Sequence, residues 1–260
     1  MITIDCINNP SRAGGFGNQL FKVCAAIAYA LDNSTTVALP EWHFNEYLKI
    51  PFENIDTGIE NFEPIHDSHG QVLVEFPKNK NLNITDHGYF QDLRYFHHHH
   101  ASIIKRLELK ENKKIEFYDL LSSNLPNWQN LKLAFIHVRR GDYHGLEYIL
   151  PMQSKTYYDY ALNLIEYDKC IVLSDELDWC KNTFDYKNLI YLDYSDKYFD
   201  MFLMTLCSSG IIANSTFSWF GAYLNPNNPR IVKPKFWFSS ISGNNTHDHS
   251  KIKLKNWMEV

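Results

Sequence analysis

The chain contains 260 residues, of which 45% are apolar, and it carries a formal net charge of −5. A chain of this length and apolar content can form two halves that each bury a core of their own. The acidic balance excludes the broad basic surface that nucleic-acid binding requires, although a local basic cluster can still bind an anionic nucleotide.

The cysteines and the amino terminus indicate a reducing compartment. The five cysteines form no CxxC pair, and four of them lie in apolar runs, as small core residues do. The first residues show no basic region followed by an apolar stretch, and no window approaches 18 uninterrupted apolar residues. We therefore expect a cytoplasmic protein and leave peripheral association with a membrane open.

The first half of the chain begins with a strand–helix–strand pattern. Residues 2–7 predict a strand, residues 8–17 a glycine-rich loop, and residues 20–31 a helix with one apolar face. A second strand is expected at residues 35–39. The loop has a G-x-G but lacks the third glycine of a dinucleotide fingerprint, which argues against a nicotinamide enzyme.

The rest of the first half is irregular until a helix that we expect near the end of residues 90–109. Four consecutive histidines, His97 to His100, precede this helix. They cannot all face one metal ion from a helix, because ligands there need a spacing of three or four residues. We expect an exposed stretch, with a pairing of His97 and His100 as the alternative. Residues 122–130 predict a linker between domains at 1–125 and 126–260.

The second half alternates strands and helices. Such alternation predicts a parallel sheet covered by helices, so the fold class is α/β with two Rossmann-like domains that face a cleft. The expected strands are 133–138, 170–173, 188–192, 211–213 and 230–232, and the expected helices are 154–166, 176–183, 197–208 and 216–224.

The most informative segment follows the first strand of this half. His137, Arg139, Arg140 and Asp142 lie where a buried strand ends, and ligands of α/β proteins collect at the carboxyl ends of strands. The guanidinium group offers a rigid set of donors that fits two phosphate oxygens at once. Asp142 can hold one guanidinium in place, and His137 can hydrogen-bond a base or ribose. The alternative is a surface turn with solvated charges.

Two further strand ends carry polar residues. Ser174 and Asp175 end the next strand, where the acid can cap the following helix or accept hydrogen bonds from guanine or ribose. Ser215 lies before a helix whose first amides and positive dipole suit a phosphate group, and its alternative role is that of an N-cap. Neighbouring strands bring these residues to one edge, which predicts a nucleotide-sugar site that also includes Asn214, Thr216 and Phe217.

The sequence predicts no catalytic metal and no cofactor. It contains no Asp-x-Asp pair, which many nucleotide-sugar transferases use to hold a divalent metal on the diphosphate. A compact His-Asp-His cluster at residues 247–249 lies in a Ser/Asn/Gly-rich tail, and we expect it to be solvated.

Four motifs together resemble a known family. His137–Tyr143 reads HVRRGDY and resembles the HxRRxD motif of α-1,2-, α-1,6- and protein O-fucosyltransferases. With GGFGNQLF at 14–21, GYFQ at 88–91 and ANSTFSWFGA at 213–222, in family order, the chain is similar to the α-1,2-fucosyltransferases of glycosyltransferase family 11. The resemblance implies a GT-B fold and transfer of L-fucose from GDP-fucose, with inversion, to a galactose-containing glycan acceptor. The expected position of transfer is O2 of galactose.

The resemblance also implies roles for individual residues. Arg139 would meet the charge that builds on the departing diphosphate. Asn18 would orient the acceptor hydroxyl or the diphosphate, as in the similar turn of protein O-fucosyltransferases, or it only shapes the turn. Asp142 is the nearest carboxylate to serve as general base, and the departing phosphate is the alternative. The expected substrate-binding residues include Gly15, Gly17, Gln19 and Arg140.

Two other classes of function stay open at this point. One is a glycan- or nucleotide-binding protein without catalytic activity. The other is an enzyme of the same fold that uses a different nucleotide sugar.

Overall fold

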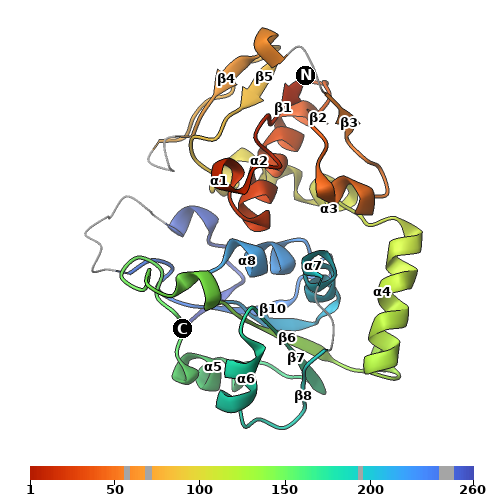
Figure 1. The fold of residues 1–260 in the computed structure, drawn as a ribbon, viewed down its shortest axis with the longest axis vertical. Coiled ribbons are helices and arrows are strands. Elements are labelled where there is room, and N and C mark those ends of the chain that lie inside the picture. Colours follow the sequence, from red (N-terminus) through yellow and green to blue (C-terminus); the bar gives the residue numbers. More distant parts are fainter. Residues whose placement is uncertain (56–58, 68–71, 193–195, 240–248) are drawn as a thin grey trace. The chain divides into compact units, whose positions relative to one another are not determined.

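The computed structural model describes most of the chain. The described residues are 1–55, 59–67, 72–192, 196–239 and 249–260. They form two compact units (Figure 1). The first unit takes in residues 1–114 and, among the described residues of the tail, 249–253, and the second takes in the remainder. The boundary between the units lies after residue 114, eleven residues before the expected domain boundary at residue 125, and residues 249–253 of the tail group with the first unit.

The strands of the first unit are very short. β1 (Ile2–Thr3), β5 (Leu82–Ile84) and β4 (Glu63–Ile65) form a parallel sheet in the order β1-β5-β4. β2 (Ala38–Leu39) pairs in parallel with β3 (Glu53–Asn54). The strands expected at 2–7 and 35–39 are thus reduced to two residues each, because the chain turns directly after β1 and pairs only briefly at β2.

The main helix of the first unit is α2 (Phe16–Asp32). It begins after Gly15, and apolar residues line most of its surface, so it is buried along nearly its whole length. The loop before it contains a short helix that we did not expect, α1 (Pro10–Ala13), which Asn9 caps by accepting from the amide of Ser11. The other helices that the structure describes in this unit are η1 (His43–Tyr47), η2 (Ile59–Asn61), η3 (Leu93–Tyr95), η4 (His97–His99), α3 (His100–Arg106) and, from the tail, η8 (His249–Ile252).

The second unit is built on a six-stranded sheet in which every pairing is parallel. Its order is β11-β10-β9-β6-β7-β8, which, counted from the first strand of the unit, is the 3-2-1-4-5-6 order of the Rossmann fold. The strands are β6 (Leu133–Val138), β7 (Lys169–Ser174), β8 (Leu189–Ile190), β9 (Ser209–Ile211), β10 (Arg230–Lys233) and β11 (Met258–Glu259).

Helices cover both faces of this sheet (Figure 1). One face carries α5 (Lys155–Leu162) and α6 (Leu177–Thr183), and the other carries α7 (Lys197–Leu206) and α8 (Thr216–Tyr223). All six residues of the central strand β6 are consequently buried.

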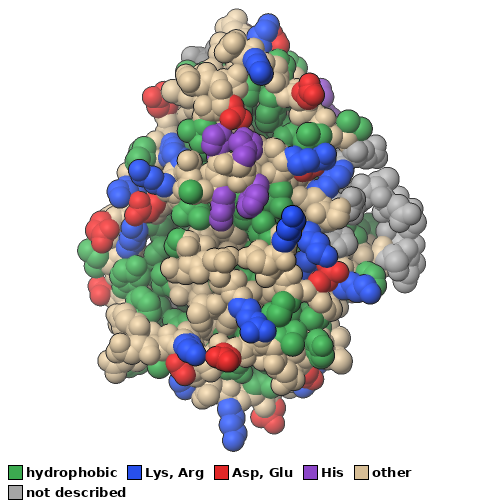
Figure 2. Space-filling model, turned by 180° about the vertical axis from the view of Figure 1, so that it is seen from behind, with side chains coloured by type: hydrophobic (Ala, Val, Ile, Leu, Met, Phe, Trp, Pro, Cys, Tyr) green, Lys and Arg blue, Asp and Glu red, His purple; other side chains and the backbone are tan. Residues whose placement is uncertain are grey.

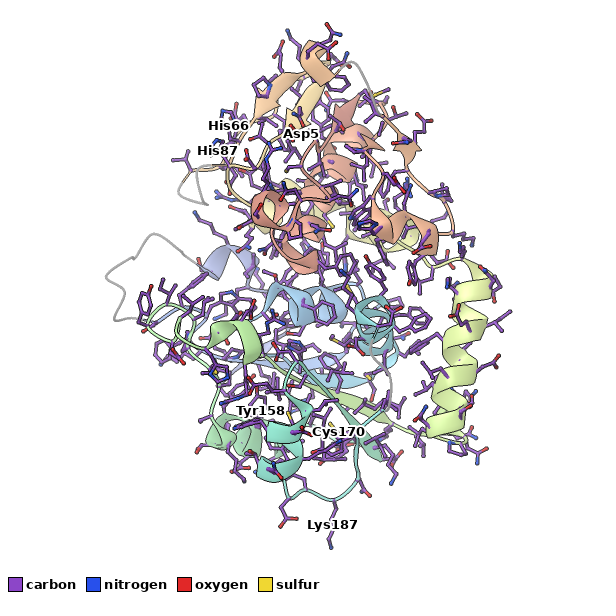
Figure 3. The ribbon with its side chains drawn as sticks, in the orientation of Figure 1. Asp5, His66, His87, Tyr158, Cys170 and Lys187 are labelled. Atoms are coloured by element: carbon purple, nitrogen blue, oxygen red, sulfur yellow. The ribbon has the colours of Figure 1, made fainter. Side chains whose placement is uncertain are left out.

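Close packing fixes one glycine of the second unit. A Cβ atom on Gly210 of β9 would lie 2.1 Å from the ring of Phe135 on β6, so a larger side chain would displace the ring. On the face that α5 and α6 cover, Tyr158 of α5, which is labelled in Figure 3, donates to the carbonyl of His137 over 3.4 Å. The strand that leads into the HVRRGDY segment is therefore held on both faces.

The expected linker at 122–130 is wrong. Helix α4 (Glu111–Asn124) includes the first residues of this expected linker, and the 3-10 helix η5 (Trp128–Asn130) forms its end. α4 is helical because Phe117 and Leu121, four residues apart, share a buried stripe, and Phe117 packs 5.2 Å from Phe199 of α7 between ring centroids. Among the described residues, no helix combines the length and the apolar character that crossing a bilayer requires.

Candidate nucleotide-sugar site

The position of β6 in the sheet decides which polar residues lie close together in the candidate site. β6 pairs with β7 on one side and β9 on the other, so the polar residues that follow these three strands lie at adjacent strand ends, as expected. Between β6 and β9 the order of the strands reverses. In open α/β sheets, ligands bind in the crevice outside the carboxyl ends of the strands at such a reversal. The HVRRGDY and ANSTF segments follow the two strands between which the order reverses.

Arg139 is held by two carboxylates. Its two terminal nitrogens lie 2.7 Å from Asp142 Oδ2 and 2.9 Å from Asp175 Oδ2. Its side chain is 33% exposed, so the guanidinium keeps access to solvent. Two of its five N–H donors are sufficient for these contacts. The arrangement fixes the plane of the guanidinium group and leaves donors for an oxyanion.

Asp175 does not cap helix α6. The N-cap of this helix is Glu176, which makes no capping hydrogen bond with its side chain. Asp175 instead pairs with Arg139 and accepts from the backbone amide of Arg140 over 3.0 Å. A Cβ atom on Gly141 would lie 2.9 Å from Asp175 Oδ2, so the glycine of the motif allows this carboxylate to approach. The capping interpretation is wrong, and Asp175 is a partner of the arginine pair.

Arg140 has a different environment from Arg139. Its Nε lies 3.0 Å from Glu176 Oε2, and its guanidinium lies 4.1 Å from the ring centre of Trp179. Glu176 also contacts His144 Nε2 over 2.5 Å. Arg140 therefore anchors the loop to α6. The expected basic cluster is compensated, because the carboxylates of Asp142, Asp175 and Glu176 accompany the two arginines.

His137 is buried and neutral. It is 4% exposed, its ring centroid lies 5.5 Å from that of Phe217, and its Nδ1 atom has no hydrogen-bond partner among the described residues. Burial and the nearby Arg139 charge lower its pKa to about 3. A buried polar atom without a partner needs an explanation, and a ligand hydroxyl or amide that reaches the ring would provide one.

The start of α8 provides the third part of the site. Ser215 occupies the N-cap position, is buried, and makes no capping hydrogen bond, so the N-cap alternative does not describe its hydroxyl. Asn214 is fixed in place: it donates to the carbonyl of Trp237 over 3.0 Å and accepts from Gln153 Nε2 over 3.1 Å. The first amides of α8, from Thr216 onward, need acceptors from outside the helix.

Ser174, the last of the expected substrate-binding residues in the second unit, shapes the backbone. Ser174 accepts from the amide of Glu176 over 2.9 Å and so turns the chain after β7. Sequence reasoning missed Glu176, Gln153 and Tyr143, whose hydroxyl donates to the carbonyl of Asn214 over 2.8 Å. Glu176 and Tyr143 lie two and five residues after a strand end, whereas Gln153 lies 15 residues after β6 and has no such signal.

The glycine-rich turn of the first unit forms its own hydrogen-bonded group. Asn18 accepts from Gln91 Nε2 over 3.0 Å, which joins the GGFGNQ and GYFQ motifs. Gln19 donates to the carbonyl of Gly14 over 3.2 Å and accepts from Trp42 Nε1 over 3.0 Å. Gly14 has φ +76°, and a Cβ atom there would lie 2.6 Å from the Asn18 amide. Gln91 is a polar neighbour that sequence reasoning missed.

The other two glycines of this turn differ in their surroundings. Gly15 is exposed, and a Cβ atom there would meet nothing within 4 Å, so its backbone amide is approachable. Gly17 is buried in the first turn of α2.

Among the described residues, the group that could hold a metal ion is Asp32, His98 and His99, none of which belongs to the strand ends of the second unit. Residues 247 and 248 lie outside the described residues.

The family model of glycosyl transferase family 11 matches residues 19–260. The chain belongs to glycosyltransferase family 11. It is 29% identical to the O-antigen biosynthesis glycosyltransferase WbnK of Escherichia coli, over 95% of this chain and 98% of that protein. It is 26% identical to an α-1,2-colitosyltransferase of Escherichia coli, over 87% of this chain and 90% of that protein.

Its fold is similar to that of POFUT1 in complex with GDP-fucose. The TM-score is 0.58 at 12% identity, and the match covers 89% of this chain and 96% of that chain. At this identity the likeness concerns the fold alone. The family membership makes this chain a glycosyltransferase, and it agrees with the resemblance that the four motifs indicate.

Proposed function

We propose that this glycosyltransferase moves L-fucose from GDP-fucose to O2 of a galactoside, with inversion and without a catalytic metal. The observation that carries the proposal is the group at the reversal of the strand order. There, Arg139 follows β6 and is oriented by two carboxylates, and α8, whose N-cap residue makes no capping hydrogen bond, follows the neighbouring strand β9. This arrangement presents a guanidinium and uncapped backbone amides to an anionic leaving group.

The mechanism follows from where charge develops. As the bond between the sugar and the diphosphate breaks, negative charge builds on the diphosphate oxygens. Arg139, which Asp142 and Asp175 hold in place, stabilises this charge together with the first amides of α8. The proton of the acceptor hydroxyl goes to Asp142, whose side chain is 64% exposed, or to the departing phosphate.

Asn18 is the group that we assign to the acceptor side. Its carboxamide accepts from Gln91 Nε2, which orients it without engaging its own N–H donors in that contact. We assign the acceptor to the first unit and the donor to the second, in keeping with a GT-B fold. Gly15, Gly17 and Gln19 contribute the turn that presents Asn18. A cytoplasmic location and a galactoside acceptor belong to the same proposal.

One observation favours a second candidate. The relative named an α-1,2-colitosyltransferase supports the α-1,2 linkage but names a different sugar. The site as described does not separate these sugars, because the residues that we assign to the donor contact the nucleotide and the diphosphate. The second candidate is therefore the same transfer with colitose in place of fucose.

The test is release of nucleoside diphosphate with lactose as acceptor. Parallel reactions contain GDP-fucose, GDP-mannose or UDP-galactose, and each is repeated with the Arg139→Ala variant as the matched control. The proposal expects lactose-dependent release from GDP-fucose alone, and a strong loss in the variant. Release from UDP-galactose would contradict the guanine assignment. Release without lactose, at a rate that lactose does not raise, would indicate hydrolysis.

A further inference from the structure

A second site lies in the first unit, outside the residues assigned to fucosyl transfer. Asp32, the last residue of α2, meets His98 and His99 of η4, which are 66 and 67 residues further along the chain. Histidine side chains gather on the face of the molecule that Figure 2 shows. The contact therefore ties the end of the buried helix α2 to the segment that precedes α3.

The three side chains converge on one point. His98 Nε2 lies 3.2 Å from Asp32 Oδ2, and His99 Nε2 lies 2.7 Å from Asp32 Oδ1. Each imidazole thus directs its Nε2 atom at the same carboxylate, and the three possible ligand atoms lie within 4.8 Å of one another. A tetrahedral zinc ion with ligands at about 2.0–2.2 Å requires ligand separations of about 3.4 Å. The observed separations, 2.7 and 3.2 Å to the carboxylate and at most 4.8 Å between any two of these atoms, lie on both sides of that distance.

Local charge favours a cation at this point. Asp32 ends α2, whose last turn contains no basic residue, so its carboxylate adds to the negative end of the helix dipole. An aspartate carboxylate is ordinarily ionised at neutral pH. Two imidazoles and one carboxylate form a ligand set that suits zinc, cobalt, nickel and copper ions.

We propose that Asp32, His98 and His99 bind one divalent transition-metal ion of the zinc class, with solvent completing its coordination. The ion binds the two Nε2 atoms, and their protons move to Nδ1 of the same ring or leave to solvent. Its role is structural, because it joins α2 to η4, two segments of the first unit that are distant in sequence. The proposal does not depend on the fucosyl-transfer mechanism.

The experiment uses the full chain, with any polyhistidine tag removed and metal stripped by EDTA and gel filtration. Zinc is titrated by calorimetry, and cobalt by its visible absorption. The wild-type protein should bind one ion per chain at this site and melt at a higher temperature with zinc. Asp32→Asn, His98→Ala and His99→Ala should each weaken binding by more than about tenfold, since even outer partners of a ligand contribute about 10–100-fold.

Two double variants serve as matched controls. His97→Ala with His100→Ala removes the neighbouring pair, whose ring centroids are 5.4 Å apart, and His66→Ala with His87→Ala removes a pair at 5.7 Å. Both should retain the tight site and the zinc-dependent rise in melting temperature. If zinc binds no better to the wild type than to Asp32→Asn, or if only the His97 and His100 variant loses binding, the proposal is wrong. The metal-free melting temperature of each variant verifies that it folds.

Discussion

The substitution Arg139→Lys distinguishes a phosphate clamp from a surface ion pair. The two terminal nitrogens of Arg139 reach Asp142 and Asp175 at 2.7 and 2.9 Å. A lysine ammonium keeps the charge but has only one nitrogen, so it cannot contact both carboxylates and a diphosphate in the same geometry. The variant therefore retains the net charge of the site and loses its orientation.

The two interpretations differ in where the cost is measured. As an ion pair, the side chain is one-third exposed, and pairs near the surface contribute about 0.2–1 kcal/mol to folding. As a donor to the developing charge, its loss should cost about 2.7–4 kcal/mol in the transition state, or roughly 10²–10³ in kcat. The assay measures kcat and KM for GDP-fucose and lactose together with the free energy of unfolding in urea.

We expect Arg139→Lys to be nearly as damaging as Arg139→Ala in kcat, while the free energy of unfolding changes by about 1 kcal/mol or less. If Arg139→Lys retains most of the wild-type turnover, Arg139 is not the phosphate clamp. Arg140 would be a poor substitute for it, because Glu176 and Trp179 already engage its guanidinium.

Three further predictions follow from the geometry. Asn18→Ala should lower kcat far more than it weakens GDP binding, because the proposal assigns Asn18 to the acceptor and the nucleotide to residues of the second unit; calorimetry with GDP and steady-state kinetics compare the two, and equal losses would contradict it. Activity should survive EDTA, which would also strip the site at Asp32; loss of activity that Mg²⁺ or Mn²⁺ restores would overturn the metal-independent mechanism. His137 has a pKa of about 3 when folded and about 6.5 when unfolded, so the unfolded chain binds more protons between these values and stability falls as the pH drops from 6.5 towards 3. The slope of unfolding free energy against pH, up to about 1.4 kcal/mol per unit, should be smaller in His137→Gln, and parallel curves would refute the assignment.

The second unit was more predictable from the sequence than the first. Its strands alternate with amphipathic helices, and the long, fully buried strand β6 gives a clear apolar signal at residues 133–138. The first unit has strands of two or three residues, which are too short to show a period. β11 was missed for the same reason: it has two residues, and it is held in the sheet by its pairing with β10 and the 2.6 Å contact between Lys233 and Glu259.

The chemical character of the site could be predicted, but its internal pairing could not. The sequence places Arg139, Arg140 and Asp142 after one strand and Asp175 after another. Which acid meets which arginine depends on the register of β6 and β7, where Val138 lies opposite Ser174. This register brings Glu176 to Arg140 and Asp175 to Arg139, and it converts an expected basic cluster into a compensated one.

The measurement that tests the central proposal most directly is an NMR analysis of the product formed from GDP-fucose and lactose. The proposal predicts a trisaccharide in which the anomeric proton of an α-linked fucose correlates with C2 of galactose. A product with fucose on another carbon would contradict the assigned linkage, and a β-linked product would contradict inversion. If the enzyme forms no trisaccharide from GDP-fucose but does so from GDP-colitose, the assignment of fucose is wrong.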